Sequence, residues 1–308
     1  MSRCLCCQKE TDGEGRYHPR CLNKLFGVSW IPKVPFGIGD MPAEISKSGA
    51  KMSISGVQIK ASVKLDREKQ EIIMVQTGGT HVLKAEPNEY PELPQNENCC
   101  MNIAQDLGMD VPPHGLFLMT DGKLCYVIKR FDRLDNGEKI HKESIAQILS
   151  IKTEDKYKGS LENVGKTIQK YAKNVGLDLI NFFERVLLSF LTGNGDMHLK
   201  NWALITLPNG EMHLAPCYDF VCSKIHIPNE EDFALTINGR KNKIRKRDFA
   251  ALGMSLKIEP RAIENALDRF KDARDTILEA VGYSELSAER KKILDEVIRA
   301  RYDRLYGV

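Results

Sequence analysis

The spacing of hydrophobic residues divides the chain into a strand-rich first half and a helical second half. Between residues 57 and 131, apolar positions recur with a period of about two, as in the run from Val57 to Leu65. Beyond Phe131 the spacing changes to about 3.6 residues for most of the remaining chain. Because strands come first and helices follow, rather than alternating, we expect an α+β fold with two lobes.

The same spacing, read with the turn residues between the runs, gives the individual elements. We expect strands at 57–65, 71–76, 80–85, 114–119, 123–131, 202–207 and 211–216. We expect helices at 96–107, 142–150, 161–175, 178–192, 246–254, 259–280 and 285–305. Residues 50–85 are typical of an antiparallel meander, and Asn96 is expected to cap the helix that follows it.

The segment before the first strand has a different composition. The stretch WIPKVPFGIGDMP (30–42) contains three prolines and two glycines, which exclude a regular helix across it. We therefore expect three parts. They are an N-terminal Cys/His appendage and linker (1–45), a strand-rich N-lobe (46–133) and a helical C-lobe (134–308).

Composition and charge narrow the class of protein. The 308 residues include 45 Lys and Arg against 42 Asp and Glu, a net charge of +3 that is too small to indicate nucleic acid as a direct partner. No run reaches the roughly 18 apolar residues that span a bilayer, and the N-terminus lacks the apolar stretch of a signal peptide. The nine cysteines are scattered apart from one N-terminal cluster. We expect a cytoplasmic protein without membrane contact.

The loop GNGDMHLKNWAL (193–204) has the strongest chemical pattern. It holds Asp196 and Asn201 five residues apart, with His198 and Lys200 between them. An acid of this kind can act as general base beside a hydroxyl while the amide binds Mg²⁺, although the same residues could simply cap turns. Asp219 follows the next expected hairpin, so it can return to this loop as a second oxygen ligand, which suits Mg²⁺ rather than zinc.

These motifs resemble a known family. Protein kinases carry Asp, four residues and Asn, then a hairpin and Asp-Phe-Gly; here Asp219-Phe220 precedes valine and the His-Arg-Asp prefix is missing. The pattern is instead similar to the HipA-type serine/threonine kinases, toxins of bacterial toxin–antitoxin pairs. The matching segments are Asp196-Met-His198-Leu-Lys200-Asn201, Pro216-Cys-Tyr218-Asp219 and Arg130-Phe131-Asp132-Arg133.

The upstream half agrees with this resemblance. The segment MSISGVQIK (52–60) resembles the family's phosphate loop, although by itself it is equally a serine- and glycine-rich hairpin turn. The residues that would hold the nucleotide are Ser53, Ile54, Ser55, Gly56, Val57, Gln58, Lys60, Lys84, Glu97, Lys129 and Phe131. Of these, Phe131 and the backbone around Lys129 would face the adenine. Lys84 would pair the phosphates and Glu97 would hold it, the alternatives being a solvated lysine at a strand edge and an acid that compensates the helix dipole.

The resemblance implies a two-lobed, protein-kinase-like fold and an ATP- and Mg²⁺-dependent serine/threonine protein kinase. Asp196, Lys200 and His198 would be the catalytic residues, and Asn201 and Asp219 would bind the metal. The short region before the phosphate loop resembles the HipT-like branch. That branch implies autophosphorylation at Ser53 and Ser55 and a small HipS-like protein as partner. The family resemblance implies an aminoacyl-tRNA synthetase as substrate, whose phosphorylation would stop translation, and a HipB-like DNA-binding antitoxin as second partner. The rival interpretations are a small-molecule phosphotransferase and a nucleotide-binding interaction module.

Two further features are open. Cys4, Cys7, His18 and Cys21 have ligand types and spacing compatible with structural zinc, with Cys6 as a competing ligand. The alternative is a set of reduced thiols packed in a small hairpin. The basic run RKNKIRKR (240–247) could bind an acidic substrate or RNA, but a solvated face is the simpler interpretation.

Overall fold

The computed structural model describes residues 2–13, 15–48, 53–55, 58–134 and 137–307, with the side chains of Ser48 and 53–55 left out. The chain forms two compact units, which we describe separately. Unit 1 comprises Met1–Asn102, Pro112–Lys139 and Tyr283–Leu286, and unit 2 comprises Ile103–Val111, Ile140–Gly282 and Ser287–Val308. These units differ from the three parts expected, because residues 1–45 belong to unit 1.

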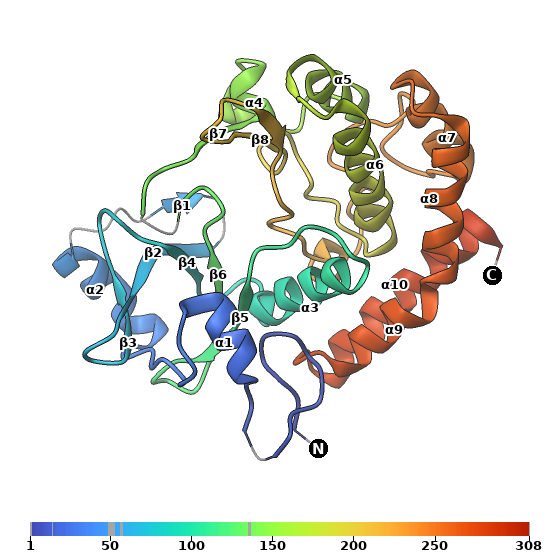
Figure 1. Cartoon of the computed structure of the whole chain (residues 1–308). Helices are drawn as coiled ribbons and strands as arrows, with labels where there is room; N and C mark the ends of the chain where they lie inside the picture. Colours follow the sequence, from blue (N-terminus) through green and yellow to red (C-terminus); the bar gives the residue numbers. More distant parts are fainter. Residues whose placement is uncertain (1, 14, 49–52, 56–57, 135–136, 308) are drawn as a thin grey trace. The chain divides into compact units, whose positions relative to one another are not determined.

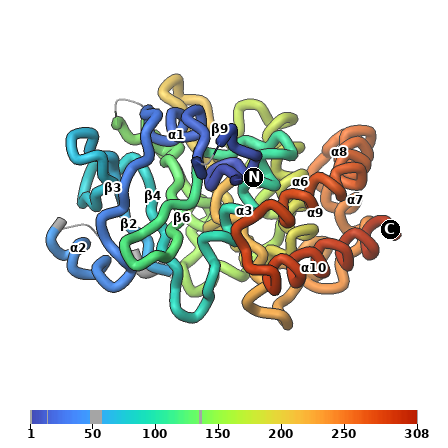
Figure 2. The backbone as a smooth tube through the Cα atoms, turned by 90° about the horizontal axis from the view of Figure 1, so that it is seen from below, coloured from blue at the N-terminus to red at the C-terminus, as the bar shows by residue number. Residues whose placement is uncertain are grey.

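Unit 1 is built on an antiparallel sheet. Its strands are β1 (Ser53–Ser55), β2 (Gln58–Asp66), β3 (Glu71–Met74), β4 (His81–Lys84), β5 (His114–Leu118) and β6 (Leu124–Lys129). The order is β1-β2-β4-β6-β5, and β3 pairs with β2. Figures 1 and 2 show β2, β4 and β6 next to one another. The expected meander is therefore wrong in its pairing, because β4 returns to β2 instead of adding to β3.

The N-terminal segment shares the hydrophobic core of this sheet. It contains the helices α1 (Pro19–Phe26) and α2 (Met41–Ser48) and a short 3₁₀ turn at Ile38–Asp40. Leu22, Leu25 and Phe26 from α1 pack in one buried cluster with Ala61 and Val63 of β2. Pro19 at the first turn and Gly27 at the left-handed end (φ 68°) delimit α1, a helix that the hydrophobic spacing did not predict. Residues 1–45 thus form part of the unit's core.

Helix α3 (Leu93–Asp106) begins three residues before the position expected. Asn96 is buried within the helix, and its amide donates to the carbonyl of Glu92, so the prediction of Asn96 as the N-cap is wrong. Pro94 occupies the first turn, where its missing N–H has no cost. The earlier start places Glu97 one turn inside the helix.

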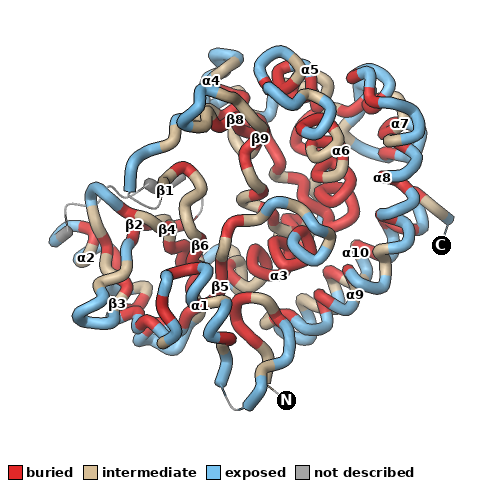
Figure 3. Tube along the Cα trace, viewed as in Figure 1, coloured by how far each residue is buried: buried red, intermediate tan, exposed pale blue. Residues whose placement is uncertain are grey.

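Unit 2 contains a small sheet and most of the helices. The sheet order is β7 (His141–Ser144), β8 (Ala203–Thr206) and β9 (Met212–Leu214). The helices are α4 (Ile145–Ile148), α5 (Leu161–Tyr171), α6 (Val175–Leu191), α7 (Lys246–Ser255), α8 (Pro260–Asp272), α9 (Arg274–Tyr283) and α10 (Ala288–Tyr306). Figure 3 shows that α6 is largely buried, as its nearly continuous apolar sequence predicted. Among the described helices, none is long and apolar enough to cross a membrane.

Two helix predictions in unit 2 need correction. The helix expected at 142–150 is a strand, β7, followed by the single turn α4, because residues 141–144 pair with β8. Ser144 then starts α4 with a capping box to Gln147. The helix expected at 259–280 is divided at Ala273 into α8 and α9.

Candidate functional site

In unit 1, a buried lysine on a strand is paired with an acid on a helix. Lys84, the last residue of β4, places its Nζ 2.5 Å from Oε1 of Glu97 on α3. The two residues are 5% and 2% exposed. The Lys84 Nζ also lies 5.6 Å from the centre of the Tyr126 ring on β6. Burying two charges is costly unless they pair closely, so this contact fixes the position of the lysine.

The neighbouring strand β2 contributes a second cation. Lys60 stands directly opposite Lys84 in the antiparallel register, and directly opposite residues have side chains on the same face. Gln58 is buried, and its Nε2 donates to the carbonyl of Ala85 at 2.9 Å, so this side chain ties β2 to the end of β4. Two lysines on one face are suited to a polyphosphate, because each adds positive charge beside it.

The described part of the predicted phosphate loop forms strand β1 and the start of β2. The backbone of β1 pairs with β2 from Ser53–Lys60 to Ser55–Gln58. This antiparallel pairing agrees with both interpretations of the motif. The side chains of Ser53, Ile54 and Ser55, and all of Gly56 and Val57, lie outside the described residues.

Of the predicted adenine-facing residues, Lys129 ends β6 and Phe131 lies two residues beyond it. The Lys129 amide donates to the carbonyl of Pro113 at 2.8 Å, and Phe131 is half-buried in the turn beyond it. This turn is held by Asp132, which accepts two hydrogen bonds from Arg130 at 2.7 and 2.8 Å and pairs with Arg133 at 3.0 Å. Adenine contact by Lys129 and Phe131 remains a prediction.

In unit 2, the loop after α6 brings the predicted catalytic acid and amide together. The Asp196 carbonyl accepts a hydrogen bond from Nδ2 of Asn201 at 3.1 Å. The Asp196 carboxylate accepts another from the Tyr157 hydroxyl at 2.6 Å. The backbone amide of Gly195, just before it, donates to the Ser223 hydroxyl at 2.7 Å. These three hydrogen bonds hold the loop in place. The Asp196 side chain is half-buried.

The hairpin β8–β9 returns the chain to this loop, as expected. The Tyr218 hydroxyl donates to the Lys200 carbonyl at 3.0 Å. Asn201 follows Lys200 and Asp219 follows Tyr218 in the chain, so this hydrogen bond holds the two segments together. Asp219 has φ 56°, a left-handed conformation that is uncommon outside glycine and recurs at functional sites. Because Asn201 uses its Nδ2 toward Asp196, a metal held by this residue would meet its amide oxygen. An amide oxygen and a carboxylate are hard donors, so this pair fits Mg²⁺.

The other two predicted catalytic residues have structural contacts. His198 is buried, and burial lowers its pKa, which favours the neutral ring. Its ring packs edge-on against Tyr157 with centroids 5.2 Å apart. The Lys200 Nζ donates to the Thr153 hydroxyl at 2.9 Å. Roles for His198 and Lys200 in the reaction remain predictions.

Two further residues lie beside Asp196, and the sequence analysis gave neither of them a role. Tyr157 belongs to the pair Lys156-Tyr157, which resembles a pair in the HipA-type kinases, but nothing in its chemistry demanded a catalytic role. Glu230 accepts a hydrogen bond from the Ser223 hydroxyl. Burial raises the pKa of the Glu230 carboxyl, and repulsion from the Asp196 carboxylate acts in the same direction. Glu230 has no motif of its own, so no local sequence signal identifies it.

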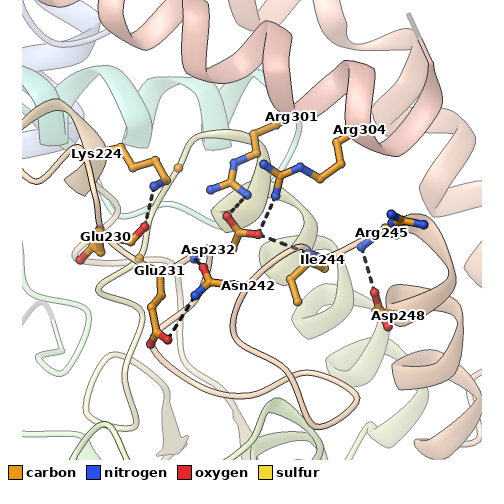
Figure 4. Close-up of polar contacts among 12 residues, drawn as sticks. Lys224, Glu230, Glu231, Asp232, Asn242, Ile244, Arg245, Asp248, Arg301 and Arg304 are labelled. Carbon is orange, nitrogen blue, oxygen red and sulfur yellow. Dashed lines mark hydrogen bonds and ion pairs between the residues drawn. The ribbon is translucent and has the colours of Figure 1, made fainter.

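The segment that carries Glu230 is anchored to α10 (Figure 4). Asp232 is buried and pairs with Arg301 and Arg304 of α10, the latter at 2.6 Å. Lys224 donates to the backbone carbonyl of Glu230 at 2.6 Å, as Figure 4 shows. A helix far away in sequence thereby holds the residues that flank the Asp196 loop.

The predicted zinc ligands come together in unit 1. The candidate ligand atoms of Cys4, Cys7, His18 and Cys21 all lie within 4.8 Å of one another. The group is separate in the sequence from every residue of the kinase-like motifs.

Comparison with known proteins agrees with these motifs. The family model described as HipA-like C-terminal domain matches residues 52–277. A Haemophilus influenzae protein named provisionally as a kinase is 32% identical over 62% of this chain and 58% of its own length. The Sinorhizobium fredii protein Y4dM, also named provisionally as a kinase, is 30% identical over 74% of this chain and 60% of its own length. The chain thus matches about three fifths of each relative.

Solved structures show the same fold. The HipA chain of the Shewanella oneidensis complex of HipA, HipB and operator DNA superposes with a TM-score of 0.70 at 22% identity, covering 89% of this chain and 72% of that one. The Helicobacter pylori proinflammatory kinase CtkA gives 0.57 at 16% identity, covering 89% and 95%. The predicted mixed α and β, kinase-like fold is thereby confirmed. The chain belongs to the family of the HipA-like C-terminal domain.

Proposed function

We propose that this chain is an ATP- and Mg²⁺-dependent protein serine/threonine kinase. The observation that carries the proposal is the buried pair of Lys84 and Glu97, 2.5 Å apart between a strand and a helix. Kinases require such a pair to position the nucleotide phosphates. A sheet needs no buried charge for its stability, so a lysine held in this way favours a binding role.

The residues of unit 2 supply the remaining parts of the chemistry. Asp196 would accept the proton of the substrate hydroxyl, and the Tyr157 hydroxyl, 2.6 Å from its Oδ1, would hold the carboxylate in position. Asn201 and Asp219 would hold Mg²⁺, which neutralises negative charge on the phosphates when it is bound. Lys60 would add positive charge for the phosphates on the face that Lys84 occupies.

The test is intact-mass spectrometry of the full chain after incubation with Mg·ATP. The parent should gain phosphate, and peptide mapping should place it on the segment that contains Ser53 and Ser55. Asp196→Asn should slow the gain by about 10²- to 10⁴-fold, because the general base is lost. Asp155→Asn is the matched control, since this acid in the same unit pairs with exposed Lys158 and leaves the loop intact.

Each outcome discriminates between the candidate functions. A gain that Asp155→Asn preserves and Asp196→Asn removes supports a protein kinase with Asp196 as its base. No gain by a parent sample shown to start unphosphorylated would contradict autophosphorylation, and phosphorylation of a small hydroxyl compound would then identify a small-molecule phosphotransferase. If neither product forms, the remaining candidate is a nucleotide-binding module, which an ATP-binding measurement would detect.

The biological setting is part of the same proposal. The Shewanella HipA structure is a complex with HipB and operator DNA, so we extend a HipB-like antitoxin to this chain as its partner. A HipS-like small protein, an aminoacyl-tRNA synthetase as substrate, inhibition of translation and the HipT-like branch rest on the resemblance of the motifs. Phosphorylation at Ser53 or Ser55 would place about two negative charges beside the nucleotide phosphates and weaken ATP binding by repulsion.

A further inference from the structure

We propose that Cys4, Cys7, His18 and Cys21 bind a structural Zn²⁺ ion in unit 1. Their candidate ligand atoms lie within 4.8 Å of one another. The Nδ1 atom of His18 is 3.3 Å from the Cys7 sulfur and 3.9 Å from the Cys21 sulfur. A tetrahedral zinc ion with bonds of about 2.0–2.3 Å requires ligands roughly 3.5–3.8 Å apart. The described atoms already approach that arrangement.

The histidine is held in the form that a metal requires. The Nε2 atom of His18 lies 2.9 Å from the carbonyl oxygen of Glu10. A carbonyl can only accept, so Nε2 carries the proton and Nδ1 presents its lone pair to the three sulfurs. Zinc-binding histidines typically donate their second ring nitrogen to a carbonyl in this way, which fixes the ring.

The fourth neighbouring cysteine lies outside the ligand group. Cys6 is buried against β5, and a Cβ atom added to Gly115 would come within 2.5 Å of its sulfur. The backbone carbonyl of Cys6 accepts a hydrogen bond from Asn102 at 2.9 Å. Cys6 therefore packs against β5 and against α3 at Asn102, both of which belong to unit 1. The Cys6 thiol also interacts with the Cys4 thiol, but Cys6, a competing ligand in the sequence, is not one of the four residues whose ligand atoms all lie within 4.8 Å of one another.

The contacts of the cluster indicate what the metal would stabilise. The Leu5 carbonyl accepts a hydrogen bond from the Leu116 amide at 3.0 Å, and the Tyr17 hydroxyl donates to the Leu116 carbonyl at 2.8 Å. Leu116 lies in β5, which ends the strand order of the sheet. Leu22, Leu25 and Phe26 of the same segment already pack in the core, and a bound metal would add its binding free energy to these contacts. We infer that zinc fastens residues 2–13 and 15–27 over this edge.

The decisive experiment measures metal in the purified full chain and in single variants. The parent should contain about one zinc ion per chain, and Cys21→Ser should bind zinc at least about 10-fold more weakly. Cys6→Ser is the matched control and should keep the full zinc content. His18→Cys should also keep it, because four thiolates form a common structural site.

Two measurements on the parent keep the test valid if Cys21→Ser fails to fold. X-ray absorption at the zinc edge should give three sulfur neighbours and one nitrogen, changing to four sulfurs in His18→Cys. Cobalt substituted for zinc should show the intense visible bands of a tetrahedral thiolate site. The proposal is overturned by a metal-free parent that also fails to take up zinc or cobalt, by oxygen-dominated coordination, or by equal zinc loss in Cys6→Ser and Cys21→Ser.

Discussion

Tyr157 is the residue whose contact with the proposed catalytic base makes the sharpest prediction. Its hydroxyl donates to the Asp196 carboxylate at 2.6 Å, although the residue is 42% exposed. A hydrogen bond to a charged group contributes about 1.5–3 kcal/mol, and here part of that would serve to orient the base. We expect Tyr157→Phe to lower kcat for phosphate transfer roughly 10-fold while the KM for ATP stays unchanged.

Steady-state kinetics with Mg·ATP checks this prediction. Tyr171→Phe is the control, because it removes a hydroxyl from another exposed tyrosine of unit 2, at the end of α5. A rise in the KM for ATP with constant kcat would assign Tyr157 to nucleotide binding instead. Equal kinetics for Tyr157→Phe, Tyr171→Phe and the parent would show that the hydrogen bond has no part in the reaction.

At the scale of single residues, the sequence identifies those that belong to motifs and misses those that reach the site from elsewhere. The Asp196–Asn201 contact follows from a spacing of five in one loop, and it was expected. Tyr157 and Glu230 are 39 and 34 residues away from Asp196 in the chain, so their proximity depends on the tertiary fold. No periodicity or local composition carries that information.

Among the helices, α5 packs so closely on the end of α7 that a glycine is required. A Cβ atom added to Gly165 would lie 2.6 Å from Cδ2 and 3.0 Å from Cγ of Leu256, which is fully buried. Alanine favours helices by about 1 kcal/mol over glycine, but overpacking a buried side chain costs about 1–3 kcal/mol. We therefore expect Gly165→Ala to lower the free energy of unfolding of unit 2, as measured by urea denaturation.

Gly176→Ala is the matched control for this prediction. Gly176 lies near the start of α6, where an added Cβ atom meets no other atom within 4 Å. Only the helix propensity then acts, so the free energy of unfolding should stay constant or rise by up to about 1 kcal/mol. If Gly165→Ala were as stable as Gly176→Ala, Leu256 would have room to move, and the close packing of α5 would have no energetic consequence.

The ends of elements were less predictable than their existence, for physical reasons. The strand β7 was expected to be helical, because residues 142–150 have helical spacing, yet pairing with β8 satisfies its backbone instead. Hydrogen bonds to a distant strand outweigh the small differences in local propensity. The break at Ala273 between α8 and α9 has neither glycine nor proline to mark it. Long runs such as α6 were placed within a few residues, since most of their face is buried.

On the scale of the whole molecule, the order of strands before helices predicts the fold class but misplaces the N-terminal segment. Its prolines and cysteines suggested an appendage. Val34, Phe36 and Met41 from this segment are nonetheless buried in the same cluster as β2. The apolar residues are too sparse there to show a period, and their burial depends on a sheet formed later in the chain. Composition therefore indicates an irregular segment without indicating its partner.

The two units should respond differently to acid because of their buried histidines. Burial lowers the pKa of His81 and His114 in unit 1 to about 4. Their ordinary value is about 6.5, so the folded state favours the neutral rings. This contribution to stability is complete above about pH 6.5 and is lost as the pH falls toward 4, by at most about 3 kcal/mol for each ring. In unit 2, carboxylates of Asp196 and Asp219 oppose the lowering at His198.

The two tryptophans of the chain allow each unit to be followed separately. Trp30 packs against the core of unit 1 and Trp202 is buried in unit 2. In Trp202→Phe, the remaining fluorescence should change between about pH 6.5 and 4, whereas in Trp30→Phe it should change at lower pH. Adding His114→Gln to Trp202→Phe should flatten the pH dependence of unit 1, and the residues of the proposed zinc site are the same in both proteins. Coincident transitions in the two reporters would instead mean that the units unfold as one, because a single cooperative transition gives every probe the same midpoint.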